Sequence, residues 1–114
     1  MEWRERVERE LETADAARAR GNEGMARVCA RRAAGWAAEA YLQERDQGLS
    51  SPSVLEQMRH LVKLGDLQPE LMGKVEHLLT LKRKDAEGGD SYFPLDVDLV
   101  AEARGLIAAL FPEG

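Results

Sequence analysis

The residues best suited to chemistry form a group of arginines in the first third of the chain. The group consists of Arg18, Arg20, Arg27, Arg31 and Arg32. Asp15 and Glu23 are the acids closest to it in the sequence. Arg27 and Arg31 are four residues apart and would share one helix face, and guanidinium groups suit the recognition of phosphate and carboxylate. The group predicts a surface for an anion or an acidic partner.

We assign this binding role to Arg27 and Arg31, with Arg18 and Arg20 as further members. The alternative is that these arginines pair with acids of the first helix and are otherwise solvated. The acids in question include Glu8 and Glu12. Both interpretations stay open on the sequence alone, because the net charge of −5 gives no general attraction to nucleic acid or anionic membranes, whereas local patches can oppose that average.

Catalytic and metal-binding chemistry finds little support in the sequence. The two histidines, His60 and His77, have no second histidine or cysteine at helical spacing. Asp96 and Asp98 could hold magnesium as a pair, but acids at a helix start are favoured there by the unpaired amides. Cys29, the only cysteine, falls on an apolar stripe and is interpreted as a core residue. We therefore assign no catalytic residue, no metal ligand and no cofactor.

The composition predicts one helical domain over residues 1–114. Alanine, leucine, glutamate and arginine are abundant, whereas β-branched and aromatic residues are scarce, so helix is expected nearly throughout and no sheet. Apolar runs fall far short of the roughly 20 residues that cross a bilayer, and the acidic start does not resemble a signal peptide. With one cysteine, the chain suits a reducing compartment. We expect a cytoplasmic protein without a membrane partner.

Five helices would position these residues. They are expected at residues 2–20, 23–45, 54–64, from Pro69 to about 82–84, and after Asp96. The expected inner stripe of the second helix includes Met25, Val28, Cys29, Trp36 and Tyr41 among small residues. One core should include Trp3, Trp36, Leu78 and Ile107. Residues 85–90 are expected to form a mobile loop.

Helix ends carry recognisable capping residues. Asn22 can cap the second helix, Ser53 with Glu56 has the spacing of a capping box, and Asp96 is the expected N-cap of the last helix. Gly35 is unfavourable inside a helix by about 1 kcal/mol, so it predicts a close contact with a neighbouring helix.

Residues 31–42 resemble the second helix of the HEPN family of helical domains. The matching positions are Ala33, Ala34, Ala37, Ala40, Tyr41 and Leu42. The order of elements also agrees, with an aromatic-Pro step at Phe93-Pro94 before the last helix. The resemblance implies an antiparallel bundle, a homodimer, and a small nucleotidyltransferase or another nucleotide- or RNA-related protein as partner.

RNA-cleaving HEPN members carry an arginine followed, after four to six residues, by a histidine. Residues 53–55 before His60 and 70–72 before His77 contain no arginine. We therefore expect a non-catalytic, HEPN-like interaction module. The alternative is a tetratricopeptide-like adaptor for a peptide or protein partner, suggested by Ala14, Ala17 and Gly21-Asn22. A third hypothesis is an RNA-cleaving HEPN enzyme with an unrecognised active site.

Overall fold

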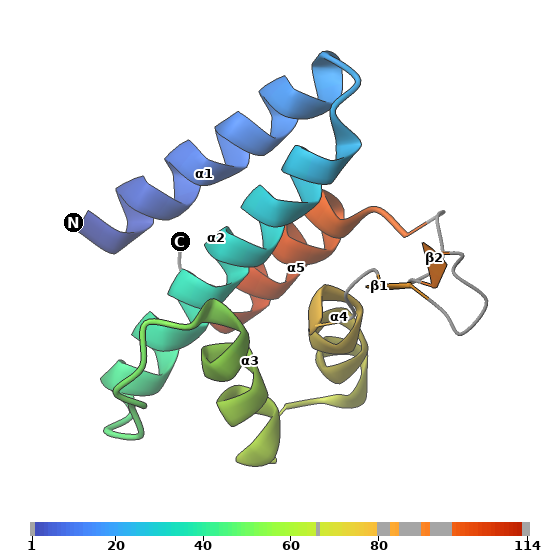
Figure 1. Ribbon diagram of the computed structural model, residues 1–114. Helices are drawn as coiled ribbons and strands as arrows, with labels where there is room; N and C mark the ends of the chain where they lie inside the picture. Colours follow the sequence, from blue (N-terminus) through green and yellow to red (C-terminus); the bar gives the residue numbers. More distant parts are fainter. Residues whose placement is uncertain (1, 66, 80–82, 85–89, 92–96, 113–114) are drawn as a thin grey trace.

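The computed structural model describes residues 2–65, 67–79, 83–84, 90–91 and 97–112. Within these ranges five helices form a bundle (Figure 1). They are α1 (Glu2–Ala19), α2 (Glu23–Glu44), α3 (Val54–Lys63), α4 (Pro69–Leu79) and α5 (Leu99–Leu110). The all-α class and the helix order expected from the apolar spacing are confirmed. The structure describes α4 as far as Leu79, and residues 80–82, over which the helix was expected to continue, lie outside the described residues.

α2 is the central helix and contacts the other four (Figure 1). α1 packs along it, with Ala14 and Ala17 fully buried, and α2 itself buries alanines along most of its length. Gly35 of α2 meets the first residue of α3, because a Cβ built on Gly35 would lie 2.7 Å from the Cα of Val54. The close contact predicted at Gly35 is confirmed.

The predicted caps of α2 and α3 are present. The Asn22 side-chain oxygen accepts a hydrogen bond from the Met25 amide at 3.1 Å, and the Ser53 hydroxyl accepts one from the Glu56 amide at 3.2 Å. The second half of the capping box differs from the prediction. Glu56 accepts a hydrogen bond from the Ser51 hydroxyl, which itself accepts one from the Ser53 amide. The Ser51 hydroxyl therefore bridges the Glu56 carboxylate and the Ser53 amide, two groups that a capping box would bond directly.

α5 is capped by Asp98 and not by Asp96. The Asp98 carboxylate accepts a hydrogen bond from the Ala101 amide at 3.1 Å, and the helix begins at Leu99. Asp98 directly precedes the first helical residue and is also bonded to Arg18, which favours it as the cap. Asp96 and the Phe93-Pro94 step lie outside the described residues.

One short strand pair accompanies the helices. β1 (Arg83–Lys84) pairs antiparallel with β2 (Asp90–Ser91), in the register Arg83 with Ser91 and Lys84 with Asp90. The expectation of no sheet is corrected to this extent, and the pair adds no layer to the bundle. Of the expected loop at residues 85–90, residues 85–89 lie outside the described part of the chain.

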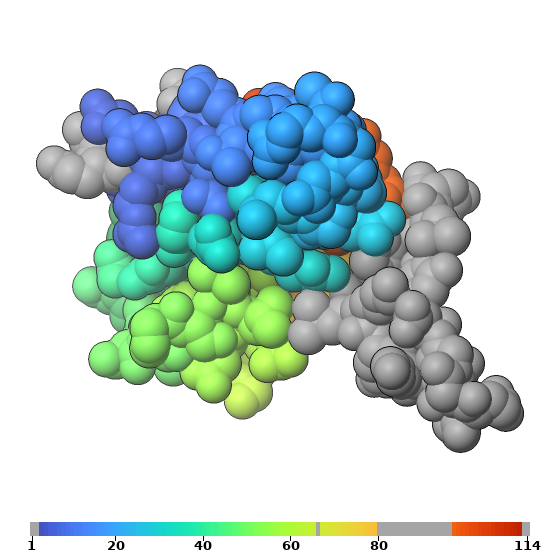
Figure 2. Space-filling view, turned by 45° about the horizontal axis from the view of Figure 1, so that its top comes forward, coloured from blue at the N-terminus to red at the C-terminus, as the bar shows by residue number. Residues whose placement is uncertain are grey.

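The core contains the residues that were expected to form it, with two exceptions. Leu78 is fully buried, and Trp3, Trp36 and Ile107 pack against the core. Met25 and Val28, predicted to face inward, are each 42% exposed. α3 packs against α2 with Val54 meeting Gly35, two turns beyond Val28, and a band of α2 surface stays open between α1 and α3 (Figure 2). None of the described helices is both long and apolar enough to cross a membrane.

Candidate interaction face

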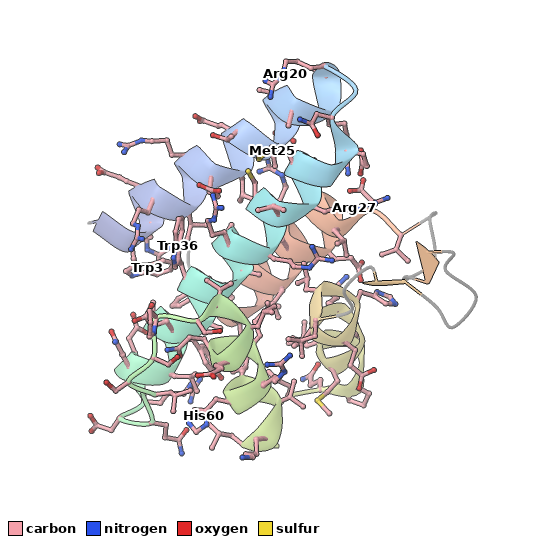
Figure 3. The ribbon with its side chains drawn as sticks, viewed as in Figure 1. Trp3, Arg20, Met25, Arg27, Trp36 and His60 are labelled. Carbon is pink, nitrogen blue, oxygen red and sulfur yellow. The ribbon has the colours of Figure 1, made fainter. Side chains whose placement is uncertain are left out.

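The arginine group is largely engaged in pairing within the protein. Arg18 binds Glu23 at 2.8 Å and Asp98 at 2.9 Å, which ties α1 to the starts of α2 and α5. The Arg27 Nε atom lies 4.0 Å from the same Glu23 carboxylate. Arg20, at the turn after α1, is exposed (Figure 3). The structure therefore brings Arg18 and Arg27 together around one acid and leaves Arg20 apart.

Arg31 reaches a different part of the fold. Its side chain is half-buried, and its Nε donates a hydrogen bond to the Leu78 carbonyl near the end of α4, at 2.9 Å. Burial, and secondarily the charge of Arg27, lowers the pKa of Arg31. Arg32 pairs with Glu10 of α1 at 2.8 Å. Pairing with acids thus dominates, although the acids are Glu10, Glu23 and Asp98 instead of Glu8 and Glu12.

Replacing Arg27 and Arg31 by alanine is expected to lower the free energy of unfolding by about 1–2 kcal/mol, because a hydrogen bond from a charged group in a half-buried setting is lost. Solvated arginines would change it by no more than about 0.5 kcal/mol. Urea denaturation measures the difference, with Arg20→Ala as the exposed control. A double variant as stable as the control would show that Arg31 does not support α4.

The Arg18 bridges predict a pH dependence. Hydrogen bonding to Arg18 lowers the pKa of Glu23, and in Asp98 the raising effect of partial burial is outweighed by hydrogen bonds from the Ala101 amide and Arg18, so its pKa is lowered too. Carboxyls with lowered pKa values stabilise the fold fully above their ordinary pKa of about 4, and this contribution disappears as the pH falls through the lowered values.

We therefore expect the stability advantage of the wild type over Arg18→Gln to be larger at pH 6 than at pH 3. Both acids are more than one-third exposed, so the advantage is small. Thermal unfolding at the two pH values measures it. An equal advantage at both would mean that the bridges do not form in solution.

The remaining candidates for chemistry have structural roles. His60 Nε2 lies 3.1 Å from the Gln47 carbonyl oxygen, and His77 Nδ1 lies 2.6 Å from Glu102, which joins α4 to α5. Cys29 is buried as predicted, and burial raises the pKa of its thiol, with a further contribution from Glu10. Within the described ranges, no three His, Cys, Asp or Glu side chains are grouped as a metal site would require.

A groove runs between α1 and α5, and we call it the α1/α5 groove. The two helices are joined at one end by the Asp15–Arg104 ion pair of 2.6 Å and at the other by contact of the tilted Trp3 and Phe111 rings, whose centroids are 4.6 Å apart. Between these contacts lies an open hollow of about 330 Å³. Its lining consists of Arg4, Glu8, Leu11, Arg104, Ile107, Ala108, Phe111 and Pro112. The hollow therefore has apolar side chains between charged ones.

Arginines stack on aromatic rings at the end of this groove. The Arg4 guanidinium lies 4.7 Å from the Trp3 ring centre and 5.1 Å from that of Phe111, and Arg45 lies 4.2 Å from that of Tyr41. A second hollow of about 540 Å³ opens here, with Arg4, Tyr41, Arg45 and Phe111 among its lining residues. Arg4 and Arg45 have no ion pair with any residue that the structure describes.

Sequence reasoning missed this face because its residues come from three helices. Arg4, Arg45 and Phe111 are separated by tens of residues, and no spacing rule joins them. The available signal was Phe111-Pro112, a large ring placed directly after the last helix, where a half-buried aromatic is easily overlooked.

Comparisons of the chain with protein-family models, with curated proteins and with solved structures each found no match.

Proposed function

We propose that this protein is a non-catalytic helical interaction module that binds a partner protein through the α1/α5 groove. The observation that carries the proposal is the open hollow between Leu11 and Ile107, bordered by arginine-stacked rings. Tyrosine, tryptophan, phenylalanine and arginine are the residues enriched in the cores of protein interfaces, and a few of them in a desolvated centre supply most of the binding energy. An apolar hollow beside such residues suits protein recognition.

The absence of catalysis in this proposal rests on the sequence, in which neither His60 nor His77 is preceded by arginine at the spacing of RNA-cleaving HEPN proteins. A HEPN-like module of this type would act beside a small nucleotidyltransferase or another nucleotide- or RNA-related protein. The tetratricopeptide-like alternative is supported by the α1–α2 hairpin with its buried alanines. The α1–α2 hairpin is a single unit of this type among the described helices, whereas tetratricopeptide-like units generally need about three copies to be stable.

We further propose that the protein forms a two-fold dimer, the commonest oligomer of small chains. An alanine-rich bundle of this length has limited core volume, so self-association would add buried apolar surface. Light scattering at tens of micromolar is expected to report twice the mass of the chain. A monomer at that concentration would contradict the dimer and would leave the groove proposal in place.

The groove proposal is tested by affinity capture from cells of the natural source. The wild type is compared with a variant whose groove is blocked at Ala108 and with a matched variant at Ala109, an exposed neighbour on α5 that does not line the hollow. A partner that is retained by the Ala109 variant and lost by the Ala108 variant supports the proposal. Retention by both would place the interaction elsewhere.

A further inference from the structure

The arginines at the end of the α1/α5 groove differ in their pairing from the arginines that hold the helices together. Arg18, Arg32 and Arg104 each bind a carboxylate of the protein at 2.9 Å or less. Arg4 and Arg45, by contrast, stack on rings and have no ion pair with the described residues. In a chain with a net charge of −5, this end therefore holds two cations without an ion pair among the residues that the structure describes.

We propose that the groove takes a helical segment of a partner protein that carries a carboxylate at one end and apolar side chains along one face. This inference rests on the proposed function and specifies the partner. The carboxylate binds between Arg4 and Arg45, and the apolar side chains occupy the hollow between Leu11 and Ile107. Stacking holds each guanidinium in place before binding, so less side-chain freedom is lost when the carboxylate arrives.

The dimensions of the groove favour a helix over an extended strand. From Arg4 to Asp15 the groove follows about three turns of α1, roughly 16 Å, which matches a helix of about 11 residues. An added strand requires the open backbone of a sheet edge, and the walls of this groove are helices, whose backbone groups bond internally. Ala108 is small and exposed, and it leaves room for a partner side chain at the centre.

The distribution of charge sets the direction of the segment. Glu8 lines the middle of the groove and Asp15 stands at the far end, so an acidic side chain is favoured only near Arg4 and Arg45. The positive field there is moderate, because Glu44 lines the second hollow and both α2 and α5 end beside it, with the negative ends of their dipoles. A single carboxylate fits this field better than the phosphate chain of a nucleic acid.

The experiment selects a displayed library of random 12-residue peptides on the purified protein. The same library is selected on Arg4→Gln/Arg45→Gln and on Arg20→Gln/Arg59→Gln, which removes the same charge from two exposed arginines, one at the α1–α2 turn and one on α3. Circular dichroism and thermal unfolding verify the fold of each. A third protein, Arg4→Lys/Arg45→Lys, keeps both charges and serves as the rescue variant.

We expect the wild type to enrich peptides that combine apolar residues at helical spacing with an Asp or Glu near one end. Individual peptides should bind Arg4→Gln/Arg45→Gln at least tenfold more weakly than the wild type. Their affinity for Arg20→Gln/Arg59→Gln should be unchanged. Their affinity for Arg4→Lys/Arg45→Lys should lie between those for the glutamine variant and the wild type. The loss should shrink at high salt, because salt screens a partly exposed charge pair.

Three results would overturn the inference. Groove-binding peptides that lack acids and bind the glutamine variant equally would refute the acidic partner and leave the proposed function standing. Binding that is insensitive to a block at Ala108 would refute both. Tight binding of poly(U) or poly(A) that depends on Arg4 and Arg45, without enrichment of acidic peptides, would replace the protein segment by single-stranded RNA.

Discussion

Replacing Gly35 by alanine is expected to lower the free energy of unfolding by about 2 kcal/mol, although alanine is the better helix former. The added Cβ would lie 2.7 Å from the Val54 Cα, a backbone atom at the start of α3, so a whole helix must shift to admit it. Overpacking of this kind typically costs about 1–3 kcal/mol, and the gain of about 1 kcal/mol in helix preference offsets only part of it where the obstacle is backbone.

Gly73 of α4 provides the matched control. It also lies inside a helix, but a Cβ built there meets nothing within 4 Å. Gly73→Ala should therefore raise the free energy of unfolding by up to about 1 kcal/mol, through helix preference and a less flexible unfolded chain. Urea denaturation of both variants gives the sign of each change. If Gly35→Ala proved as stable as Gly73→Ala, α3 would not pack on α2 through Val54.

The second large effect is expected on binding. Ala108→Glu puts a longer, charged side chain at the centre of the α1/α5 groove, where it fills the space meant for the partner and repels its carboxylate. Central interface positions commonly contribute about 2 kcal/mol or more, so affinity for the captured partner should fall by about 30-fold. Ala108 is exposed in the free protein, so stability should change by no more than about 0.5 kcal/mol.

Ala109→Glu adds the same charge at the next residue of α5, which is also exposed and lies outside the lining of the hollow. It should bind the partner within about a factor of three of the wild type, because only long-range repulsion changes. Isothermal titration of both variants measures this. Equal weakening by the two substitutions would attribute the effect to net charge and would remove the evidence for the groove.

Local features of the fold could be predicted from the sequence because their causes are local. Asn22 and Ser53 cap the helices that follow them through atoms three residues away, and the spacing alone shows this. The contact at Gly35 was predictable for a related reason: an unfavourable residue in a long helix indicates that something compensates for it. The identity of the compensating residue, Val54, required the structure.

Features that depend on the lengths and angles of several helices could not be predicted. Met25 and Val28 have the spacing of a buried stripe, yet they are exposed because α3 does not reach that part of α2. The pairing of the arginine group could not be predicted for the same reason. Its acid partners include Asp98, which is 80 residues from Arg18 in the sequence. The grouping of Arg4 and Arg45, which have no ion pair with the described residues, became visible only when three helix ends were placed together.

A nuclear magnetic resonance titration of the ¹⁵N-labelled protein with the peptide that the wild type enriches most would locate the binding face residue by residue. We expect amide shifts to concentrate at Leu11, Ile107 and Ala108, with smaller changes beside Arg45. Shifts concentrated instead around Met25 and Val28, the exposed apolar side chains of α2, or around His60 on α3, would contradict the assignment of the α1/α5 groove as the binding face.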